Sequence, residues 1–351
     1  MTDVISRVAI CSGLLLIPTI LPAPTNALPL SAGDRISITI PFGEPFTGSY
    51  EVNLDGTLKL PYLKPLSVSG LEPTEVEQKL YTILTTERYF QPNFLRVSVA
   101  VLDWAPVQVV VSGAVYEPSR VLINQPNKDE QRTPKLTFIS GDYAPKRYLT
   151  SAIQGSGGIT PYADIKNIQV FRGDREITID LSGIFTGEPV QDLPLIAGDR
   201  VIVPTLDKFQ NELMRPTQIT PPGVKVLLSN LTVPATSNAS ASVNKDSTGF
   251  PYGARFSQAV VAANCAGGTP STNANRRAVL VHTDRLTGKT YTYDRSIEEL
   301  LRDSTDNTNN PFLQSDDGVA CYDSSVSDVR DITRSILDFI NPFAAIINLF
   351  K

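Results

Sequence analysis

The stretch QGSGGITP at residues 154–161 returns later in the chain as NCAGGTP at residues 264–270. Each copy follows a short apolar run, at residues 152–153 and 259–262, and each precedes strands of alternating apolar and polar residues. Glycine permits left-handed backbone and proline cannot continue a helix, so each copy predicts the end of a helix. The repeat therefore predicts two similar units of about 100 residues, which is an ordinary domain size.

The segments around the two copies predict matching hairpins. In the first unit, apolar residues occupy every second position at 168–170 and again at 177–179. In the second unit, the runs AVLVH (278–282) and TYTY (290–293) correspond to them. LIAGDR at 195–200 closes the first unit, and QSDDGV at 314–319 stands in the same place in the second. We assign the units to 105–205 and 223–323, with a linker rich in Pro, Thr and Gln at 206–222.

A smaller unit over 28–104 precedes the repeat. Alternation of three isoleucines at 36, 38 and 40 predicts a half-buried strand. Asp55-Gly56 lies between two alternating runs, a pattern typical of a hairpin. Pro73 suits a first helical turn, and apolar residues follow at helical spacing: Val76, Leu80, Ile83 and Leu84. With a further alternating run over 95–101, this pattern predicts a small domain of strands and one packed helix.

Residues 1–27 have the pattern of a cleaved signal peptide. Arg7 supplies the positive start, an apolar run covers 8–21, and Ala27 is a small residue at the cut. Pro18 and the short run argue against a stable membrane-spanning helix, although a retained anchor stays open as the alternative.

After removal of that segment two cysteines remain, Cys265 and Cys321. An even number of cysteines in an oxidising compartment predicts a disulfide, and both lie in the second unit. Two buried free thiols are the alternative, since free cysteine is often buried.

The composition argues for ordinary globular domains and against nucleic acid binding. Charged residues make up 19% of the chain and the net charge is -5, so the basic stripe that phosphates require is not expected. The 27 prolines and 22 glycines favour many turns and short strands. The fold class expected is α+β, in a β-rich multi-domain chain.

The ordered motifs resemble a known family. AGDRI (32–36), the YEV…DG…LP hairpin of 50–61, VSGL (68–71) and VSV (97–99) resemble the polysaccharide export domain of outer-membrane export proteins. VVVSGAV (109–115), GGIT (157–160) and AGD (197–199) resemble an SLBB domain, the soluble-ligand-binding β-grasp module that follows the export domain in that family.

The resemblance implies an export domain, two SLBB-like β-grasp domains and a C-terminal helix in a periplasmic and outer-membrane protein. It implies a homo-oligomeric ring around a polysaccharide conduit for capsule or exopolysaccharide, working with an inner-membrane copolymerase. A soluble periplasmic saccharide-binding or scaffold protein without a pore is the alternative. We expect no enzyme activity, cofactor, metal or nucleic acid partner.

The last 28 residues, 324–351, predict an amphipathic helix. One stripe is apolar and is assigned to lipid: Val329, Ile332, Ile336, Phe339, Ile340, Phe343, Ile346, Ile347 and Phe350. The opposite stripe is assigned to a pore: Asp331, Arg334, Asp338, Asn341 and Asn348. About 23 residues span roughly 34 Å, near the minimum for a bilayer core, and Pro342 should kink the helix. A helix lying in the membrane interface, or packed on the protein's own body, is an equal alternative.

No catalytic constellation is visible. Glycoside hydrolysis needs two converging carboxylates. The adjacent pairs Glu298-Glu299 and Asp316-Asp317 are interpreted as solvated helix and turn surface. His282 is the only histidine and lies in a predicted strand without a ligand at metal-binding spacing. Residues 155–158 follow a helix and lack the Gly-Lys-Ser/Thr ending of a phosphate-binding loop.

Overall fold

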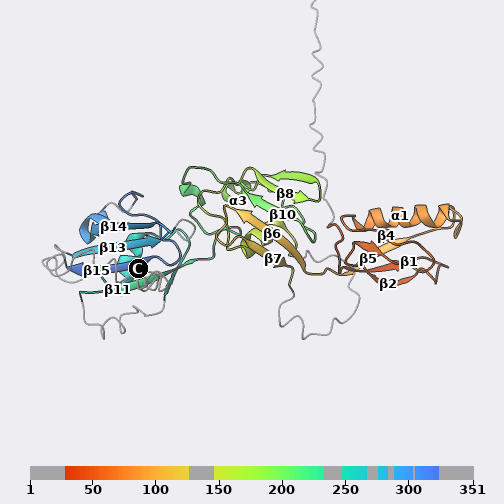
Figure 1. The fold of residues 1–351 in the computed structure, drawn as a ribbon, viewed down its shortest axis with the longest axis horizontal. Helices are drawn as coiled ribbons and strands as arrows, with labels where there is room; N and C mark the ends of the chain where they lie inside the picture. Colours follow the sequence, from red (N-terminus) through yellow and green to blue (C-terminus); the bar gives the residue numbers. More distant parts are fainter. Residues whose placement is uncertain are drawn as a thin grey trace, which may run out of the picture.

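The protein is built from three units that follow one another along an elongated molecule (Figure 1). The structure is a computed structural model, and it describes residues 28–125, 146–232, 247–266, 276–283, 288–302 and 305–323. The regular structure of the described residues consists of several separate sheets with helices packed on them. The predicted α+β, β-rich class is therefore confirmed. The predicted signal segment and the predicted C-terminal helix lie outside the described residues.

The N-terminal domain is a small sheet covered by one long helix. Its antiparallel three-stranded sheet has the order β2-β1-β5 and its second sheet pairs β3 with β4. The elements are β1 (Arg35–Thr39), β2 (Gly48–Glu51), β3 (Thr57–Leu58), β4 (Leu66–Ser67), α1 (Pro73–Thr86) and β5 (Ser98–Asp103). The isoleucines of β1 alternate as predicted, with Ile36 and Ile38 fully buried.

Helix α1 forms where the sequence predicts it. Pro73 occupies its first turn, and the Glu72 backbone N–H donates to the Glu75 carboxylate, which completes a capping box. Val76, Leu80 and Leu84 are fully buried on one stripe. This stripe joins the isoleucines of β1 in one core and so fixes the helix against the sheet.

The predicted hairpin around Asp55-Gly56 is wrong as a strand pairing. The turn itself forms, because the Gly56 N–H donates to the Asn53 carbonyl and Asn53 N–H donates to Thr57 O. However, β2 pairs with β1, whereas β3 pairs with β4 in the other sheet. The residues of the turn determine that the chain reverses direction here. The strands that pair with each arm determine which sheet that arm joins.

The first lobe is a five-stranded mixed sheet with the order β7-β6-β10-β8-β9. Its last strand lies in the middle and runs parallel to its first, β6, while the other pairings are antiparallel. The elements are β6 (Val107–Gly113), β7 (Ser119–Ile123), α2 (Leu149–Gly155), β8 (Ile168–Arg172), β9 (Arg175–Ile179), α3 (Gly183–Thr186) and β10 (Arg200–Val203).

The second lobe repeats this topology element by element. Its sheet has the order β12-β11-β15-β13-β14, and β15 again lies in the middle, parallel to the first strand. The elements are β11 (Val224–Asn230), β12 (Thr248–Phe250), α5 (Phe256–Ala262), β13 (Arg276–Thr283), β14 (Thr290–Ser296), α7 (Ile297–Arg302) and β15 (Gly318–Asp323). The repeat seen in the sequence therefore corresponds to two copies of one topology.

The exact residue equivalences differ from those of the sequence repeat. Gly158 N–H donates to Ile153 O at the end of α2, and Cys265 N–H donates to Val260 O at the end of α5, so Cys265 matches Gly158. Pairing the two copies by their glycine doublets therefore misplaces this segment by three residues. Pairing LIAGDR with QSDDGV misplaces the closing turns by one residue, since Asp199 matches Asp317. Both offsets arise because the loops between equivalent elements differ in length, and the positions of glycines alone do not set the register.

The segment 206–222, predicted as a linker, is packed between the lobes. It contains one short 3-10 turn, η1 (Asn211–Leu213). Leu213 and Ile219 are buried in the core of the first lobe, whereas Met214 is buried in that of the second. The linker therefore contributes side chains to both cores.

Candidate functional site

The three units share one local motif, a turn that ends in a buried aspartate directly before a central strand. Asp34, Asp199 and Asp317 are all fully buried. Each carboxylate accepts a hydrogen bond from the backbone N–H three residues earlier, at Ser31, Ile196 and Gln314. The residue before each aspartate has positive φ, which glycine provides twice and Asp316 once. Each carboxylate also faces a different basic side chain, and those partners distinguish the three turns.

The first aspartate joins the N-terminal domain to the first lobe. Arg147 lies just before α2 and is completely buried, and its Nη1 donates to both Asp34 carboxylate oxygens at 2.9 Å. Its Nη2 donates to the carbonyl of Pro29 at 3.2 Å, and its guanidinium lies 5.3 Å from the centre of the Trp104 ring. One side chain of the lobe therefore bonds three parts of the preceding domain.

Asp34 is held from several directions at this junction. Its Oδ1 also accepts the Ala105 N–H at 2.8 Å, where the chain passes from the domain to the lobe. Burial raises the pKa of the Asp34 carboxyl, while the Arg147 charge and the hydrogen bonds act in the opposite direction. A buried ion pair of this kind fixes the relative orientation of its partners more than it adds net stability, because both groups lose their hydration. We infer that the junction fixes the angle between the two units.

The other two buried aspartates act inside the lobes. Arg172 of β8 donates to both oxygens of Asp199, at 3.0 and 2.7 Å. The corresponding partner in the second lobe is His282, whose Nδ1 lies 2.7 Å from Asp317 Oδ1. Asp317 was interpreted as part of a solvated turn, and that interpretation is wrong. Its carboxyl is buried, and burial raises its pKa.

The two lobes meet through aromatic side chains. Tyr116 of the first lobe and Tyr252 of the second place their hydroxyl oxygens 3.3 Å apart. Phe209 of the connecting segment stacks on Phe312 of the second lobe, with ring centres 6.2 Å apart, and meets Tyr162 of the first edge to face. This contact makes the lobe junction apolar and continuous with the second core, to which Tyr116 and Phe209 also belong.

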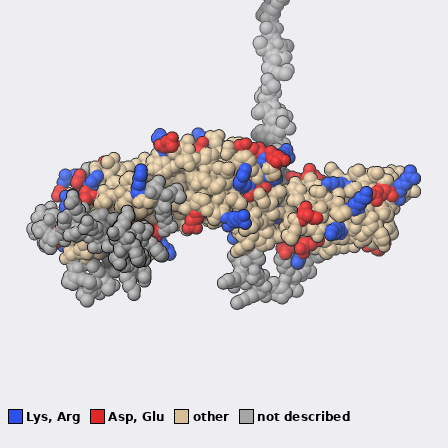
Figure 2. All heavy atoms as spheres, viewed as in Figure 1, with Lys and Arg blue, Asp and Glu red and all other residues tan. Residues whose placement is uncertain are grey.

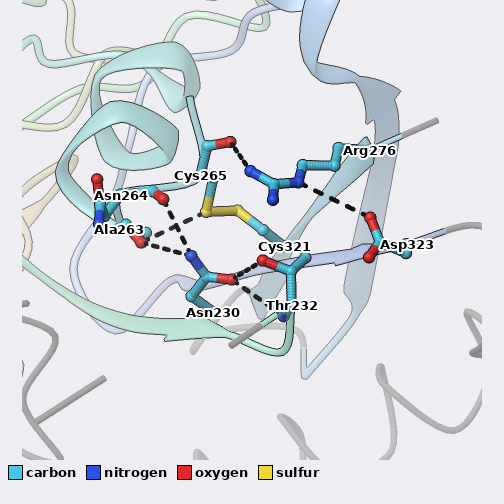
Figure 3. The surroundings of a disulfide bond; sticks show 8 residues. All are labelled: Asn230, Thr232, Ala263, Asn264, Cys265, Arg276, Cys321 and Asp323. Carbon is cyan, nitrogen blue, oxygen red and sulfur yellow. Dashed lines mark hydrogen bonds and ion pairs between the residues drawn. A yellow bond between two sulfur atoms is a disulfide. The ribbon is translucent and has the colours of Figure 1, made fainter. Parts of the chain in front are cut away.

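Figure 3 shows the disulfide between Cys265 and Cys321, which ties the end of α5 to the central strand β15. The Cα atoms are 6.0 Å apart, within the usual range for a bridge, and both residues are fully buried. Asn230 at the end of β11 donates its amide to the carbonyls of Ala263 and Asn264 beside the bridge. The bridge and this amide therefore hold helix and sheet together at one place.

The surroundings of the bridge continue to the end of the described chain. Arg276 Nη1 donates to the Cys265 carbonyl at 3.4 Å, and its Nε lies 3.8 Å from a carboxylate oxygen of Asp323, the last described residue. The same cluster thus fixes the point from which residues 324–351 continue.

The remaining sequence candidates fall into two groups. Glu298 pairs with Arg302 on the exposed surface of α7, and Glu299 accepts a hydrogen bond from the Ser296 hydroxyl, in agreement with a solvated helix surface. The lipid-facing and pore-facing residues assigned to 329–350 lie outside the described residues. In the described part of the chain no three potential ligands gather into a metal site, and none of its helices combines the length and apolar character needed to cross a bilayer.

Sequence reasoning missed Arg147, the most buried charged side chain of the domain junction. Its partner Asp34 is 113 residues away, and no local pattern around Arg147 signals the pairing. The three AGD-like turns were a usable signal, because a repeated aspartate before a strand indicates a repeated structural role.

Charges of both signs are interspersed over the visible face of the molecule in Figure 2, with wide uncharged areas between them. On this face no basic stripe gathers over the described residues, such as phosphate backbones require.

Comparison with known families identifies the first unit. Residues 22–102 match the family model described as polysaccharide biosynthesis/export protein. The N-terminal unit is a polysaccharide export domain. The match covers β1 to β5 and α1, including the Asp34 turn, and ends where the chain enters the first lobe. A search of curated proteins found no match for the chain.

The export domain implies a role in polysaccharide export, and members of this family are transport components rather than enzymes. The disulfide adds that the protein resides outside the cytoplasm, because such bridges persist in oxidising compartments.

Proposed function

We propose that the protein is a periplasmic and outer-membrane component of a channel that exports capsule or exopolysaccharide, and that it acts as a homo-oligomeric conduit. The observation that carries the proposal is the export domain at 22–102, followed on the same chain by two lobes of one topology. Enzyme chemistry plays no part in this role.

We assign the two lobes to the β-grasp class of SLBB modules, over 105–205 and 223–323. Support comes from the order of elements, two strands, a helix, two strands, a short helix and a central last strand, which is the same in both lobes. Support also comes from the packing of α2 and α5, whose buried residues join the strand residues of their own cores. The export domain, the two modules and the connecting segment 206–222 then account for residues 28–323.

The contacts between the units support a wall of fixed shape. The Asp34–Arg147 pair joins the export domain to the first lobe, and the Tyr116–Tyr252 and Phe209–Phe312 contacts join the lobes. A ring made of several copies closes only if every copy presents the same angle between its units. Buried, directional contacts at both junctions meet this requirement.

The partners of the proposed conduit are further copies of the chain, the polysaccharide that passes through and an inner-membrane copolymerase. In this proposal the apolar stripe of 329–350 faces lipid in the assembled ring, and the polar stripe, with Asp331, Arg334 and Asp338 among it, faces the pore.

Imaging of the mature chain purified in detergent tests the proposal. We expect ring-shaped particles with a hollow axis, and a mass in solution that is a fixed multiple of the monomer. A chain truncated after Asp323 serves as the matched comparison, since it keeps all three described units and removes the apolar stripe. We expect it to lose membrane association and to fail in restoring export to cells that lack the protein.

A strict monomer at every concentration, in detergent and in membranes, would contradict the conduit. If that monomer bound polysaccharide, the result would instead favour a soluble saccharide-binding or scaffold protein. Normal export by the truncated chain would remove the pore role of the C-terminal segment and leave the role of the export domain intact.

A further inference from the structure

The sheet of the second lobe is buried on both of its faces. One face packs on α5 and α7 and contains, among others, Leu280 and Val319. Successive residues of a strand point to opposite faces, and Val279, Val281, Ala320 and Tyr322 form a separate cluster on the other face. Their exposed fractions are 0%, 0%, 1% and 2%, although this cluster contains only strand residues among those described. We call this surface the outer face of the second lobe.

The first lobe shows what this surface looks like when no described element covers it. The register of the central strands matches Val279, Val281 and Ala320 with Gln169, Phe171 and Ile202. All three first-lobe residues are only half-buried. On the same face Arg200 is exposed and lies over the Phe171 ring at 4.7 Å, and Val110 is 37% exposed.

The two outer faces therefore differ in chemistry as well as in burial. Glutamine and arginine of the first lobe are replaced by valine and glycine in the second, at Val279 and Gly318. A sheet with apolar residues on both faces is typical of a sheet covered on both sides. The strands of the second lobe thus predict a covering element that the described part of the first lobe does not have.

Residues 324–351 are the segment suited to this place. Four other segments outside the described residues border the second lobe, at 233–246, 267–275, 284–287 and 303–304, and together they hold three Val, Ile, Leu or Phe residues. Residues 324–351 hold twelve. They also continue directly from β15, whose residue Tyr322 belongs to the outer face.

We propose that residues 324–351 fold back on the outer face of the second lobe, with their apolar stripe against Val279, Val281, Ala320 and Tyr322. The stripe before Pro342 covers about 13 residues, or roughly 20 Å of helix. Strand β13 has 8 residues and extends about 26 Å, so this half of the segment fits within the sheet.

This docking is independent of the proposed conduit, but it sets a condition for it. The residues that cover the sheet are those assigned to lipid, and one stripe cannot contact both surfaces at once. Membrane insertion therefore requires release of the segment from the second lobe, and the docked form keeps the stripe out of water until then.

Hydrogen exchange of the mature full-length chain in detergent-free buffer tests the proposal. We expect amides of 329–341 to exchange at least about tenfold more slowly than those of an unstructured segment. Val281→Asp, which places a charge on the outer face, should abolish this protection. Phe171→Asp is the matched control, because it makes the same change at the equivalent place in the first lobe and should leave the protection unchanged.

Truncation after Asp323 provides the second measurement. It should speed amide exchange in β13 and β15 and leave exchange in β8 and β10 unchanged. The intact mass of the truncated chain, measured without reductant, should show that the Cys265–Cys321 bridge is retained. Exchange of 329–341 at the rate of an unstructured chain would overturn the proposal, as would equal effects of the two aspartate variants. Protection of β13 that survives truncation and rises with protein concentration would overturn it too, since a second copy would then cover the face.

Discussion

Replacing Arg147 by methionine keeps most of the buried side-chain volume but removes the charge that faces Asp34. The change leaves a buried carboxylate without its cation, and it leaves the carbonyls of Pro29 and Leu195 without the donors that reach them at 3.2 and 3.4 Å. Removing one partner of a buried pair costs about 3–5 kcal/mol, because the remaining charge stays desolvated. That cost corresponds to a rise of roughly a hundredfold to several thousandfold in the opening equilibrium of the junction.

Amide exchange at the junction measures this quantity directly. The Ala105 N–H donates to Asp34, and the Ala197 N–H donates to the Ser31 hydroxyl from across the junction. If both exchange through opening of the junction, their rates should rise by the factor given above, while amides in the core of α1 should change less.

Arg35→Met is the matched control, because Arg35 follows Asp34 directly but pairs with Glu51 at the surface. That pair is 3.3 Å long, with side chains 62% and 60% exposed, and such pairs contribute about 0–1 kcal/mol. Combining Arg147→Met with Asp34→Asn should recover part of the loss, with a coupling of about 0.5–3 kcal/mol. Equal effects of Arg147→Met and Arg35→Met on the junction amides would refute the reasoning.

Three further predictions concern stability. Removing the bridge by Cys265→Ser and Cys321→Ser should cost about 4 kcal/mol by the loop-closure relation for a separation of 56 residues, measured as a lower denaturant midpoint that no longer responds to reductant. Hydrogen bonds from Thr57 lower the pKa of Asp55, so its stabilisation is present above the ordinary pKa of about 4 and is lost as pH falls through the lower folded value. Carbon NMR titration should show that lower midpoint, and an ordinary midpoint would contradict it. Gly113→Ala should destabilise far more than Gly173→Ala in thermal melts, because both glycines have positive φ, which costs about 1–2 kcal/mol, but only the Gly113 Cβ would meet the Val203 carbonyl.

Features that depend on neighbouring residues could be predicted from the sequence. The buried stripe of α1 and the isoleucine alternation of β1 follow from spacing alone, and both are present. The end of α2 at Gly155 also follows from the glycines that come next. Each of these features is set by the chain within about one helical turn or one strand, which is the range over which periodicity carries information.

Features that depend on distant partners could not be predicted. The arms of the Asp55-Gly56 turn join different sheets, and Asp317 is buried because His282 and the sheet surround it, not because of its own neighbours. The exact match of Cys265 to Gly158 depends on loop lengths between helices and strands. The strands that pair with the two arms lie 8 to 16 positions away, and His282 lies 35 positions from Asp317, so the local pattern around each residue does not contain these contacts.

The central position of β10 and β15 has a consequence for how the chain folds as it grows from its N-terminus. The middle strand of each lobe is the last to be made, so neither sheet can close until its whole stretch of chain is available. Until then two half-sheets present unpaired edges, which are prone to pair with other chains. Cys321 lies on the final strand, so formation of its bond with Cys265 reports that the second lobe is complete.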